Sequence, residues 1–201
     1  MHLCMERGPL AVSMGEIAAA AGVERVTLYR HFGDEAGLHR ALGAYCFGRF
    51  PPPGPEPFGA IADPHARTRT ALEQLYTHWE RMAPMVRPIL RDAELAPERV
   101  SLELRDRYVN EIRAVVLRGF PARQRARAAL RDAVRHAFDF RTWDSLSRGG
   151  FTRQKAVALM AALVASGSGS RIAVRTRKRS SRRRVRTLRT HVTTRSVARR
   201  V

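Results

Sequence analysis

The spacing of apolar residues along the chain predicts an all-α protein. Good helix formers, above all Ala, Leu, Arg and Glu, dominate, and long runs that alternate apolar with polar residues are absent. The clearest apolar stripe recurs at helical spacing and consists of Leu72, Leu75, Tyr76, Trp79 and Met82. Asp63 and Pro64 mark the beginning of this helix, because Asp is a favoured N-cap and Pro fits the first helical position.

Prolines divide the rest of the C-terminal part into further helices. Pro84 and Pro88 are expected to end the first helix and to leave a short element around Met85–Arg91, because proline removes a backbone donor from a helix interior. Pro97 and Pro121 stand where new helices can begin. We therefore expect further helices over about residues 97–120, 121–146 and 151–166.

Local capping signals predict three short helices in the N-terminal part. Ser13 precedes Glu16 by three residues, which is the capping-box pattern. Gly22 can take the left-handed conformation that ends a helix, and Asp34 can cap the beginning of another. The expected helices cover about residues 13–21, 25–31 and 35–50.

The first two of these helices have the spacing of a helix-turn-helix. Ala18 and Gly22 are four residues apart, so a small side chain lies where the helices cross and a glycine lies in the turn. We expect the apolar contacts to come from Ile17, Ala21, Val23 and Leu28. The second helix would expose a dense set of polar side chains, namely Arg25, Thr27, Tyr29 and Arg30. Such a face fits a DNA major groove, where arginine binds guanine or phosphate and hydroxyl groups bind phosphate.

Residues 14–42, MGEIAAAAGVERVTLYRHFGDEAGLHRAL, resemble the DNA-binding domain of the tetracycline-repressor (TetR) family of bacterial regulators. The matching pieces are Ile17-Ala18, Ala21-Gly22-Val23, Thr27-Leu28-Tyr29, His31-Phe32 and Leu38. Further along, residues 140–164 look like the last two helices of many members. The resemblance therefore implies an N-terminal helix-turn-helix domain followed by a larger helical domain that binds a ligand and dimerises.

The family resemblance also implies partners and residue roles. A homodimer would bind a palindromic double-stranded DNA operator, and an unknown small-molecule effector would move the DNA-binding domains apart and release it. The implied DNA-binding residues are Ser13, Arg25, Thr27, Tyr29, Arg30 and His31. Thr27, Tyr29 and His31 would contact the DNA backbone, and Arg25 would stand at the base-reading start of the helix. Tyr29 would also lie near a base edge, and Ser13 could touch a phosphate.

Dimerisation is expected through residues of about 124–164, because both helices predicted there carry apolar residues at helical spacing. They would form an intermolecular four-helix bundle. The residues expected to be buried in part between subunits are Leu130, Val134, Phe138, Leu159 and Leu163.

The chain departs from the family pattern near its N-terminus. Only MHLCMERG precedes the helix-turn-helix, where members usually have a full helix, so either translation begins upstream of Met1 or this copy has a weakened DNA-binding domain. Glu35 replaces the usual lysine at the start of the third helix, and an acidic side chain there repels phosphate. Glu24 adds a second negative charge in front of the second helix.

Composition divides the chain into four parts. Four of the five residues from Pro51 to Pro55 are proline, so this segment cannot be helix interior. We expect a helix-turn-helix domain at 1–50, a Pro-rich linker at 51–62, a helical ligand-binding and dimerisation domain at 63–165, and a basic, unstructured tail at 166–201. The tail contains 13 of the 37 Lys and Arg residues and none of the 18 Asp and Glu residues, so it carries most of the net charge of +19. A late frameshift or a real basic arm could each produce it.

The larger domain has an aromatic and thioether stripe that could line an effector pocket. The residues predicted to bind the ligand are Tyr76, Trp79, Met82, Met85 and Tyr108, although such residues also form ordinary core. The seven histidines and two cysteines show no metal-ligand spacing, and the chain shows neither a phosphate-binding loop nor a nucleophile elbow. We therefore predict no enzyme, no cofactor, no metal and no membrane segment, and a cytoplasmic location.

Two alternative functions remain open at this point. The chain could be a non-specific basic nucleic-acid binder driven by the tail. It could also be a defective paralogue that dimerises without binding DNA, given its short first helix.

Deleting residues 166–201 separates specific from non-specific DNA binding. We expect the affinity for random DNA at low salt to fall much more than the affinity for the operator, because the tail binds phosphates by counterion release without reading sequence. Salt titrations of both chains on operator and scrambled DNA would measure this. Loss of operator preference on truncation would show that the tail itself reads the operator.

Overall fold

The computed structural model describes residues 2–97, 100 and 102–169, and these residues form helices and no strand, which confirms the all-α prediction. The elements are α1 (His2–Arg7), the 3-10 helix η1 (Pro9–Ala11), α2 (Met14–Ala21), α3 (Arg25–Phe32), α4 (Glu35–Arg49), α5 (Glu56–Gly59), α6 (Pro64–Leu95), α7 (Glu103–Arg118), α8 (Ala122–Arg125), α9 (Ala128–Ala137), α10 (Phe140–Arg148) and α11 (Arg153–Gly167). The predicted tail lies outside the described residues from position 170 onward.

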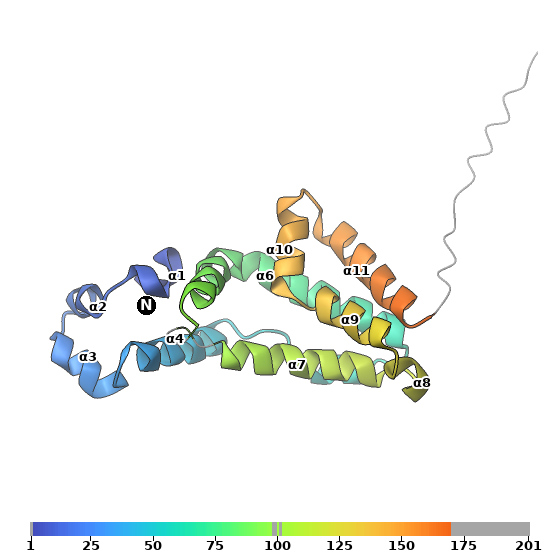
Figure 1. Ribbon diagram of the computed structural model, residues 1–201, viewed down its shortest axis with the longest axis horizontal. Coiled ribbons are helices and arrows are strands. Elements are labelled where there is room, and N and C mark those ends of the chain that lie inside the picture. Colours follow the sequence, from blue (N-terminus) through green and yellow to red (C-terminus); the bar gives the residue numbers. More distant parts are fainter. Residues whose placement is uncertain (1, 98–99, 101, 170–201) are drawn as a thin grey trace, which may run out of the picture.

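The molecule is elongated, with α2 and α3 at one end and α8 at the other (Figure 1). It has two clusters of buried apolar residues. The small cluster lies within α1–α4 and consists of Cys4, Val12, Met14, Ile17, Ala18, Leu28, Leu42 and Cys46. The large cluster joins α5 and α6 to α7, α9, α10 and α11 around Tyr76, Ile112, Leu130 and Trp143. The helix-turn-helix is thus held by a core of its own.

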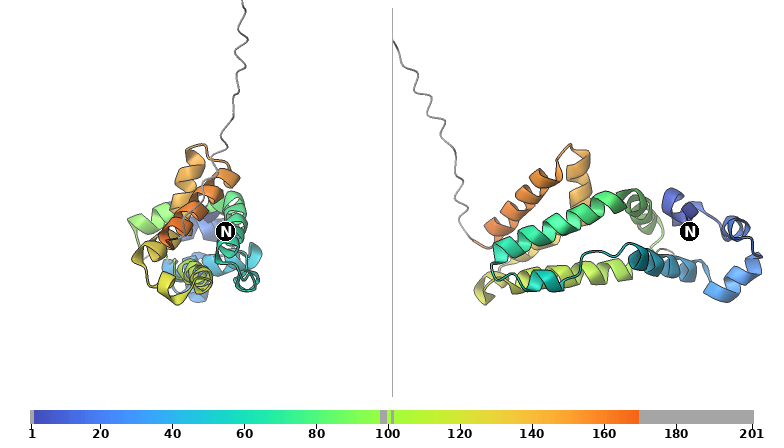
Figure 2. Two further views of the ribbon diagram at one scale, coloured as in Figure 1. Left: turned by 90° about the vertical axis from the view of Figure 1, so that its right-hand side faces the viewer. Right: turned by 180° about the vertical axis from the view of Figure 1, so that it is seen from behind.

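Helix α6 contradicts the prediction that Pro84 and Pro88 interrupt it. It continues from Pro64 to Leu95 with both prolines inside, so the expected short element around Met85–Arg91 is part of α6. Proline removes one backbone hydrogen bond and bends a helix, and the ribbon of α6 changes direction toward its C-terminal end (Figure 2). Burial of Leu90 and Ala93 beyond the prolines offsets the lost bonds and keeps the segment helical.

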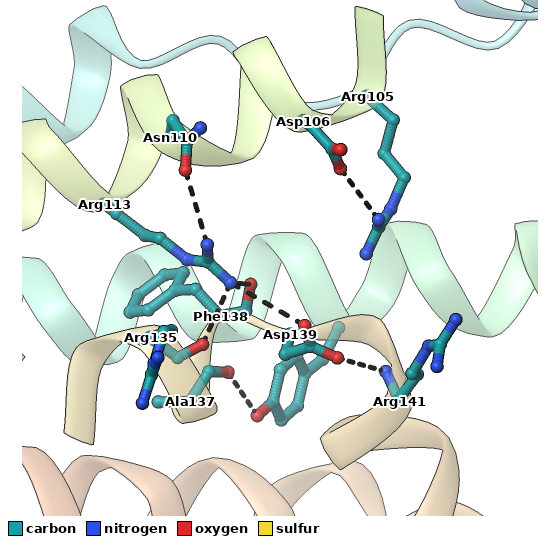
Figure 3. A network of polar contacts seen from close by, with 10 residues as sticks. Arg105, Asp106, Asn110, Arg113, Arg135, Ala137, Phe138, Asp139 and Arg141 are labelled. Atoms are coloured by element: carbon teal, nitrogen blue, oxygen red, sulfur yellow. Dashed lines mark hydrogen bonds and ion pairs between the residues drawn. The ribbon is translucent and has the colours of Figure 1, made fainter. Parts of the chain in front are cut away.

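The segment 121–146 also differs from the expectation, because it forms α8, α9 and α10 instead of one helix. Figure 3 shows the polar contacts at the second break. Arg113 of α7 donates through Nη2 to the carbonyl oxygens of Arg135 and Phe138, at 3.0 and 3.1 Å. Asp139 then caps α10 by accepting a hydrogen bond from the backbone N–H of Arg141 at 2.8 Å. The break lets carbonyl groups that a continuous helix would use internally bind a side chain of a neighbouring helix.

Helix α7 begins later than expected, at Glu103 instead of near Pro97. The last predicted helix, by contrast, is confirmed as α11. The local caps at Ser13, Asp34 and Asp63 are also confirmed, since each side chain accepts a hydrogen bond from a backbone N–H in the first turn.

Arg67 is a buried cation that joins three elements of the large domain. Its guanidinium donates to the carbonyl oxygens of Gly59, Ile61 and Val115 at 2.7–3.1 Å, and the residue is 9% exposed. These carbonyl groups lie at the end of α5, just beyond it and in α7. Arg67 therefore fixes the beginning of α6 against the rest of the domain.

Replacing Arg67 by Met should lower the free energy of unfolding by about 2–4 kcal/mol, because three backbone carbonyl groups, one buried and two part-buried, lose a charged donor. Urea denaturation followed by circular dichroism would measure the loss. Arg69→Met is the matched control, since Arg69 is exposed on the same helix and should change stability by less than about 0.5 kcal/mol. Equal effects of the two substitutions would contradict this role.

Candidate nucleic-acid interface and ligand cavity

Helix α2 begins with a complete capping box. The Ser13 hydroxyl accepts from the backbone N–H of Glu16 at 3.2 Å, and the Glu16 carboxylate accepts from the backbone N–H of Ser13 at 2.8 Å. Arg7 of α1 forms an ion pair with the same carboxylate at 3.0 Å. The hydrogen bonds from the Ser13 backbone and hydroxyl, followed by the bond from Arg7, lower the pKa of Glu16 to about 2. The carboxylate is therefore ionised at neutral pH and connects α1 to the start of the helix-turn-helix.

The turn between α2 and α3 depends on Gly22. Its φ of 67° is left-handed, and its N–H donates back to Ala18 and Ala19. Ala18 is buried where the two helices cross, as predicted, and so are Ile17 and Leu28.

Two of the expected apolar contacts are wrong. Ala21 and Val23 are exposed, because they stand at the end of α2 and in the turn. Cys4 of α1 and Met14 of α2 are buried in the same small cluster instead. The two turns of α1 therefore supply part of the cover that the short N-terminus was expected to lack.

The outward side of α3 carries the predicted polar residues. Arg25, Arg30 and His31 are exposed, and Thr27 and Tyr29 are half-buried. Nη2 of Arg25 donates to the Tyr29 hydroxyl at 3.0 Å, and the guanidinium stands 5.3 Å from the centre of the tyrosine ring. This hydrogen bond raises the pKa of Arg25, with a smaller contribution from Glu35. The two side chains thus support each other at the surface.

His31 and Ser13 complete the predicted set at the edges of this surface. His31 packs edge-to-face against Phe32, with 4.6 Å between ring centres, and Phe32 contacts the small core. Ser13 is exposed at the N-terminus of α2, although its hydroxyl is engaged in the capping box. Five of the six predicted side chains thus lie on α3, and the sixth, Ser13, directly precedes α2.

Sequence reasoning missed Val26, which is 65% exposed on α3 between Arg25 and Thr27. The sequence could have indicated that Val26 is exposed, because Leu28 two residues later faces the core and a helix turns by about 200° over two residues. An exposed branched side chain beside polar neighbours adds an apolar spot to this face.

The N-terminal segment is fastened to the far end of α6. Asp92 is 1% exposed and accepts a hydrogen bond from the backbone N–H of Leu10 at 2.8 Å. Arg91 pairs with Asp92 at 2.6 Å and donates to the carbonyl oxygen of Arg7 at 3.1 Å. Gly8 approaches so closely, with a φ of 94°, that a Cβ there would lie 2.4 Å from the Asp92 carboxylate.

A cavity of about 140 Å³ lies between α4 and the pair α6–α7. Four of the predicted ligand-binding residues line it, namely Trp79, Met82, Met85 and Tyr108. Much of the rest of the wall had no signal in the sequence, because it comes from the helix-turn-helix side: His39, Leu42, Gly43, Cys46, Phe47 and Phe50. The cavity thus belongs to both parts of the molecule.

Tyr76 does not line this cavity, so its predicted ligand role is corrected. Its hydroxyl donates to the carbonyl oxygen of Ala137 at 2.8 Å, its ring stacks on Trp79, and the residue is fully buried. Burial raises the pKa of Tyr76, so the hydroxyl stays protonated and serves as a structural donor in the large core. Tyr76 in the core and Trp79 in the cavity wall thus lie within about one turn of each other on α6.

Four polar side chains of the cavity wall, His78, Cys46, Tyr108 and Arg105, are neutral or already paired. Burial, followed by the charge of Arg81, lowers the pKa of His78, and burial raises the pKa of the Cys46 thiol. The Tyr108 hydroxyl donates to the carbonyl oxygen of Pro53 at 2.9 Å. Arg105 forms an ion pair with Asp106 at 2.9 Å.

The expected dimer residues fall into two groups. Leu130, Val134 and Phe138 are buried inside one chain, so they are not free to pack between subunits, and that part of the prediction is wrong. Leu159 and Leu163 of α11 are 43% and 41% exposed, and Phe151 just before the helix is 40% exposed. The apolar surface near the C-terminal end therefore lies on α11.

The described residues contain neither a cluster of metal-ligating side chains nor a membrane-spanning helix. Within residues 2–97, 100 and 102–169, no three His, Cys, Asp or Glu side chains are grouped so that they could hold a metal ion. In the same part of the chain, no helix combines the length and the apolar character that crossing a membrane requires.

Comparisons with known proteins agree with this architecture. The family described as "Bacterial regulatory proteins, tetR family" matches residues 1–42. The crystal structure of the TetR family transcriptional regulator PfmR from Thermus thermophilus superposes with a TM-score of 0.54 and 22% identity, covering 82% of this chain and 89% of that chain. No curated protein matches the chain. Residues 1–42 thus match the N-terminal model of the tetR family, and the described part of the chain has the fold of that solved TetR family regulator.

Proposed function

We propose that this chain is a ligand-responsive transcriptional repressor. A homodimer binds a palindromic DNA operator through α3, and a small-molecule effector in the cavity releases it. The observation that carries the proposal is the outward side of α3, where Arg25, Thr27, Tyr29 and Arg30 lie together at one end of the molecule.

The chemistry of this surface supports DNA reading. Arg25 at the start of α3 can donate two hydrogen bonds to guanine, and Val26 beside it offers an apolar contact for a thymine methyl group. Thr27, Tyr29 and His31 carry donors for phosphate oxygens, and such contacts orient a protein on the duplex. Glu24 and Glu35 weaken the attraction to phosphate around this face, so specificity rests on few contacts.

A palindromic operator requires two copies of α3, and an exposed apolar surface supports their pairing. Leu159 and Leu163 are four residues apart on α11, so they share one face of that helix, and Phe151 is exposed just before it. In a two-fold dimer the same patch of each subunit faces its copy. This surface lies in the part of the chain far from α3 (Figure 1).

The cavity supports regulation of DNA binding because its wall is formed both by α4 of the helix-turn-helix part and by α6 of the large domain. Leu42 and Cys46 come from α4, which follows α3 directly, and Met82 and Met85 come from α6. A ligand between these helices binds best at one separation of α4 from α6. The ligand therefore favours one placement of α3 over another. Such differential binding is the only way in which a ligand can shift the equilibrium between two conformations of a protein.

Tyr29→Phe and Thr27→Val should each weaken operator binding by about 1–3 kcal/mol, because each removes a hydroxyl contact and keeps the shape. The operator is first selected from a pool of random DNA, and affinity is then measured by fluorescence anisotropy. Tyr45→Phe is the matched control, since Tyr45 is 49% exposed on α4 outside the proposed interface. Unchanged affinity in both α3 variants, or an equal loss in the control, would refute the assignment.

Leu159→Glu combined with Leu163→Glu should convert the dimer to a monomer, because it places charges on both sides of the proposed interface. Sedimentation velocity at micromolar concentration would detect the change. Leu95→Glu serves as control, since Leu95 is 73% exposed at the end of α6 and should leave the dimer intact. A monomeric unmodified chain, or a double variant that stays dimeric, would contradict this interface.

A further inference from the structure

We propose that the effector is an uncharged, mostly apolar molecule of about the size of one aromatic ring, bound in the cavity between α4 and α6–α7. This inference rests on the proposed function, because it names the class of ligand for the same site. Three features of the cavity carry it: its volume, the chemistry of its wall and the state of its ionisable groups.

The volume of the cavity sets the size of the ligand. At about 140 Å³ it is close to the roughly 150 Å³ of an apolar protein cavity that is known to hold benzene. Pockets for drug-sized ligands measure about 300–1,000 Å³, so the space in this cavity suits a ligand of single-ring size better than a multi-ring compound. One substituted ring fills the available space.

The wall favours an aromatic guest. Aromatic rings reach it from four helices, namely Phe47 of α4, Trp79 of α6, Tyr108 of α7 and Phe140 of α10. Two thioethers, Met82 and Met85, follow one another along α6 on the same side. Ring edges and methionine sulfur both contact aromatic faces favourably, and methionine side chains adapt to the outline of a guest.

The ionisable groups of the wall disfavour a charged ligand. The lowered pKa of His78 and the raised pKa of Cys46 keep both side chains neutral near pH 7. The positive charge of Arg105 is paired with Asp106, and the Tyr108 hydroxyl is engaged with Pro53. A carboxylate or an ammonium would lose its hydration in this cavity, where Arg105 is already paired and His78 and Cys46 are neutral, and this loss costs several kcal/mol.

An access route lies where the wall meets the surface. Phe50 at the end of α4 is 38% exposed, and Leu104 at the start of α7 is 40% exposed, yet both line the cavity. These two side chains come from different helices that border the cavity. A ring-sized molecule can therefore enter by displacing side chains, without unfolding either domain.

A glycine in the wall allows a sharp test. Gly43 lies on α4 in the cavity wall, and a Cβ added there meets no atom within 4 Å. Gly43→Leu should therefore fill the cavity without a backbone clash. Gly48→Leu adds the same side chain to the same helix outside the cavity, where a Cβ also meets nothing within 4 Å. Val86→Phe fills the space from α6 and replaces Gly43→Leu if that variant does not fold.

Isothermal titration calorimetry of the full chain without DNA measures binding of toluene and p-cresol, with benzoate and benzylammonium as charged counterparts. We expect saturable binding of the neutral rings at one per chain, and binding of both ions weaker by roughly tenfold or more. The affinity for p-cresol should fall by roughly tenfold or more in Gly43→Leu or Val86→Phe and stay unchanged in Gly48→Leu.

Absence of saturable binding to the unmodified chain would overturn the inference. So would tighter binding of benzoate, or binding that persists in both cavity-filling variants. Because the titration needs no DNA, its result is independent of operator binding. A chain that binds p-cresol in the cavity but no operator would contradict the proposed function and still support this site.

Discussion

A buried carboxylate, Asp92, connects the helix-turn-helix end of the molecule to the rest. Burying a charge is costly unless hydrogen bonds and a counter-charge replace water, and here Leu10 and Arg91 supply both. Arg91 also reaches the carbonyl oxygen of Arg7, and Arg7 in turn pairs with Glu16 at the start of α2. One chain of polar contacts thus runs from the end of α6 to the first turn of the helix-turn-helix. The placement of α3 relative to the large domain depends on it.

This arrangement also explains why α6 must be long and continuous. Its first part holds the large core through Leu72, Leu75 and Tyr76, while its last part presents Asp92 to the N-terminal segment. If Pro84 and Pro88 had ended the helix, as the sequence suggested, the two cores would lack a common support. Met82 and Met85, on either side of Pro84, line the cavity together with residues of α4, so the continuous helix contributes to the cavity as well.

Prediction from sequence succeeded where the cause is local. The capping box at Ser13, the left-handed Gly22 and the cap at Asp63 involve groups within four residues, so their geometry follows from residue types alone. It failed where a distant group competes with the local preference. Arg113 of α7 binds carbonyl groups near residue 138 and helps to end a helix that the apolar spacing would continue. Apolar spacing likewise could not separate Tyr76, which bonds to Ala137, from Trp79, which lines the cavity. The α4 part of the wall was invisible because contacts between domains leave no periodic signal.

The proposed ligand and the polar contacts of Asp92 both bear on the placement of the helix-turn-helix relative to α6. Asp92 fixes α1 and η1 to the end of α6, and the proposed ligand lies between α4 and the same helix. A ring of about eight heavy atoms can bind with roughly 2–12 kcal/mol, at about 0.3–1.5 kcal/mol per atom. Coupling free energies between two sites are typically about 1–3 kcal/mol, so a ligand of this size would suffice for the regulation that we propose. Coupling is reciprocal, so under the proposed function the operator is expected to weaken ring binding by the same factor. Under the proposed function, we expect a chain without the Asp92 attachment to bind a ring in the cavity with less effect on α3, because the polar contacts that join α6 to the helix-turn-helix are lost.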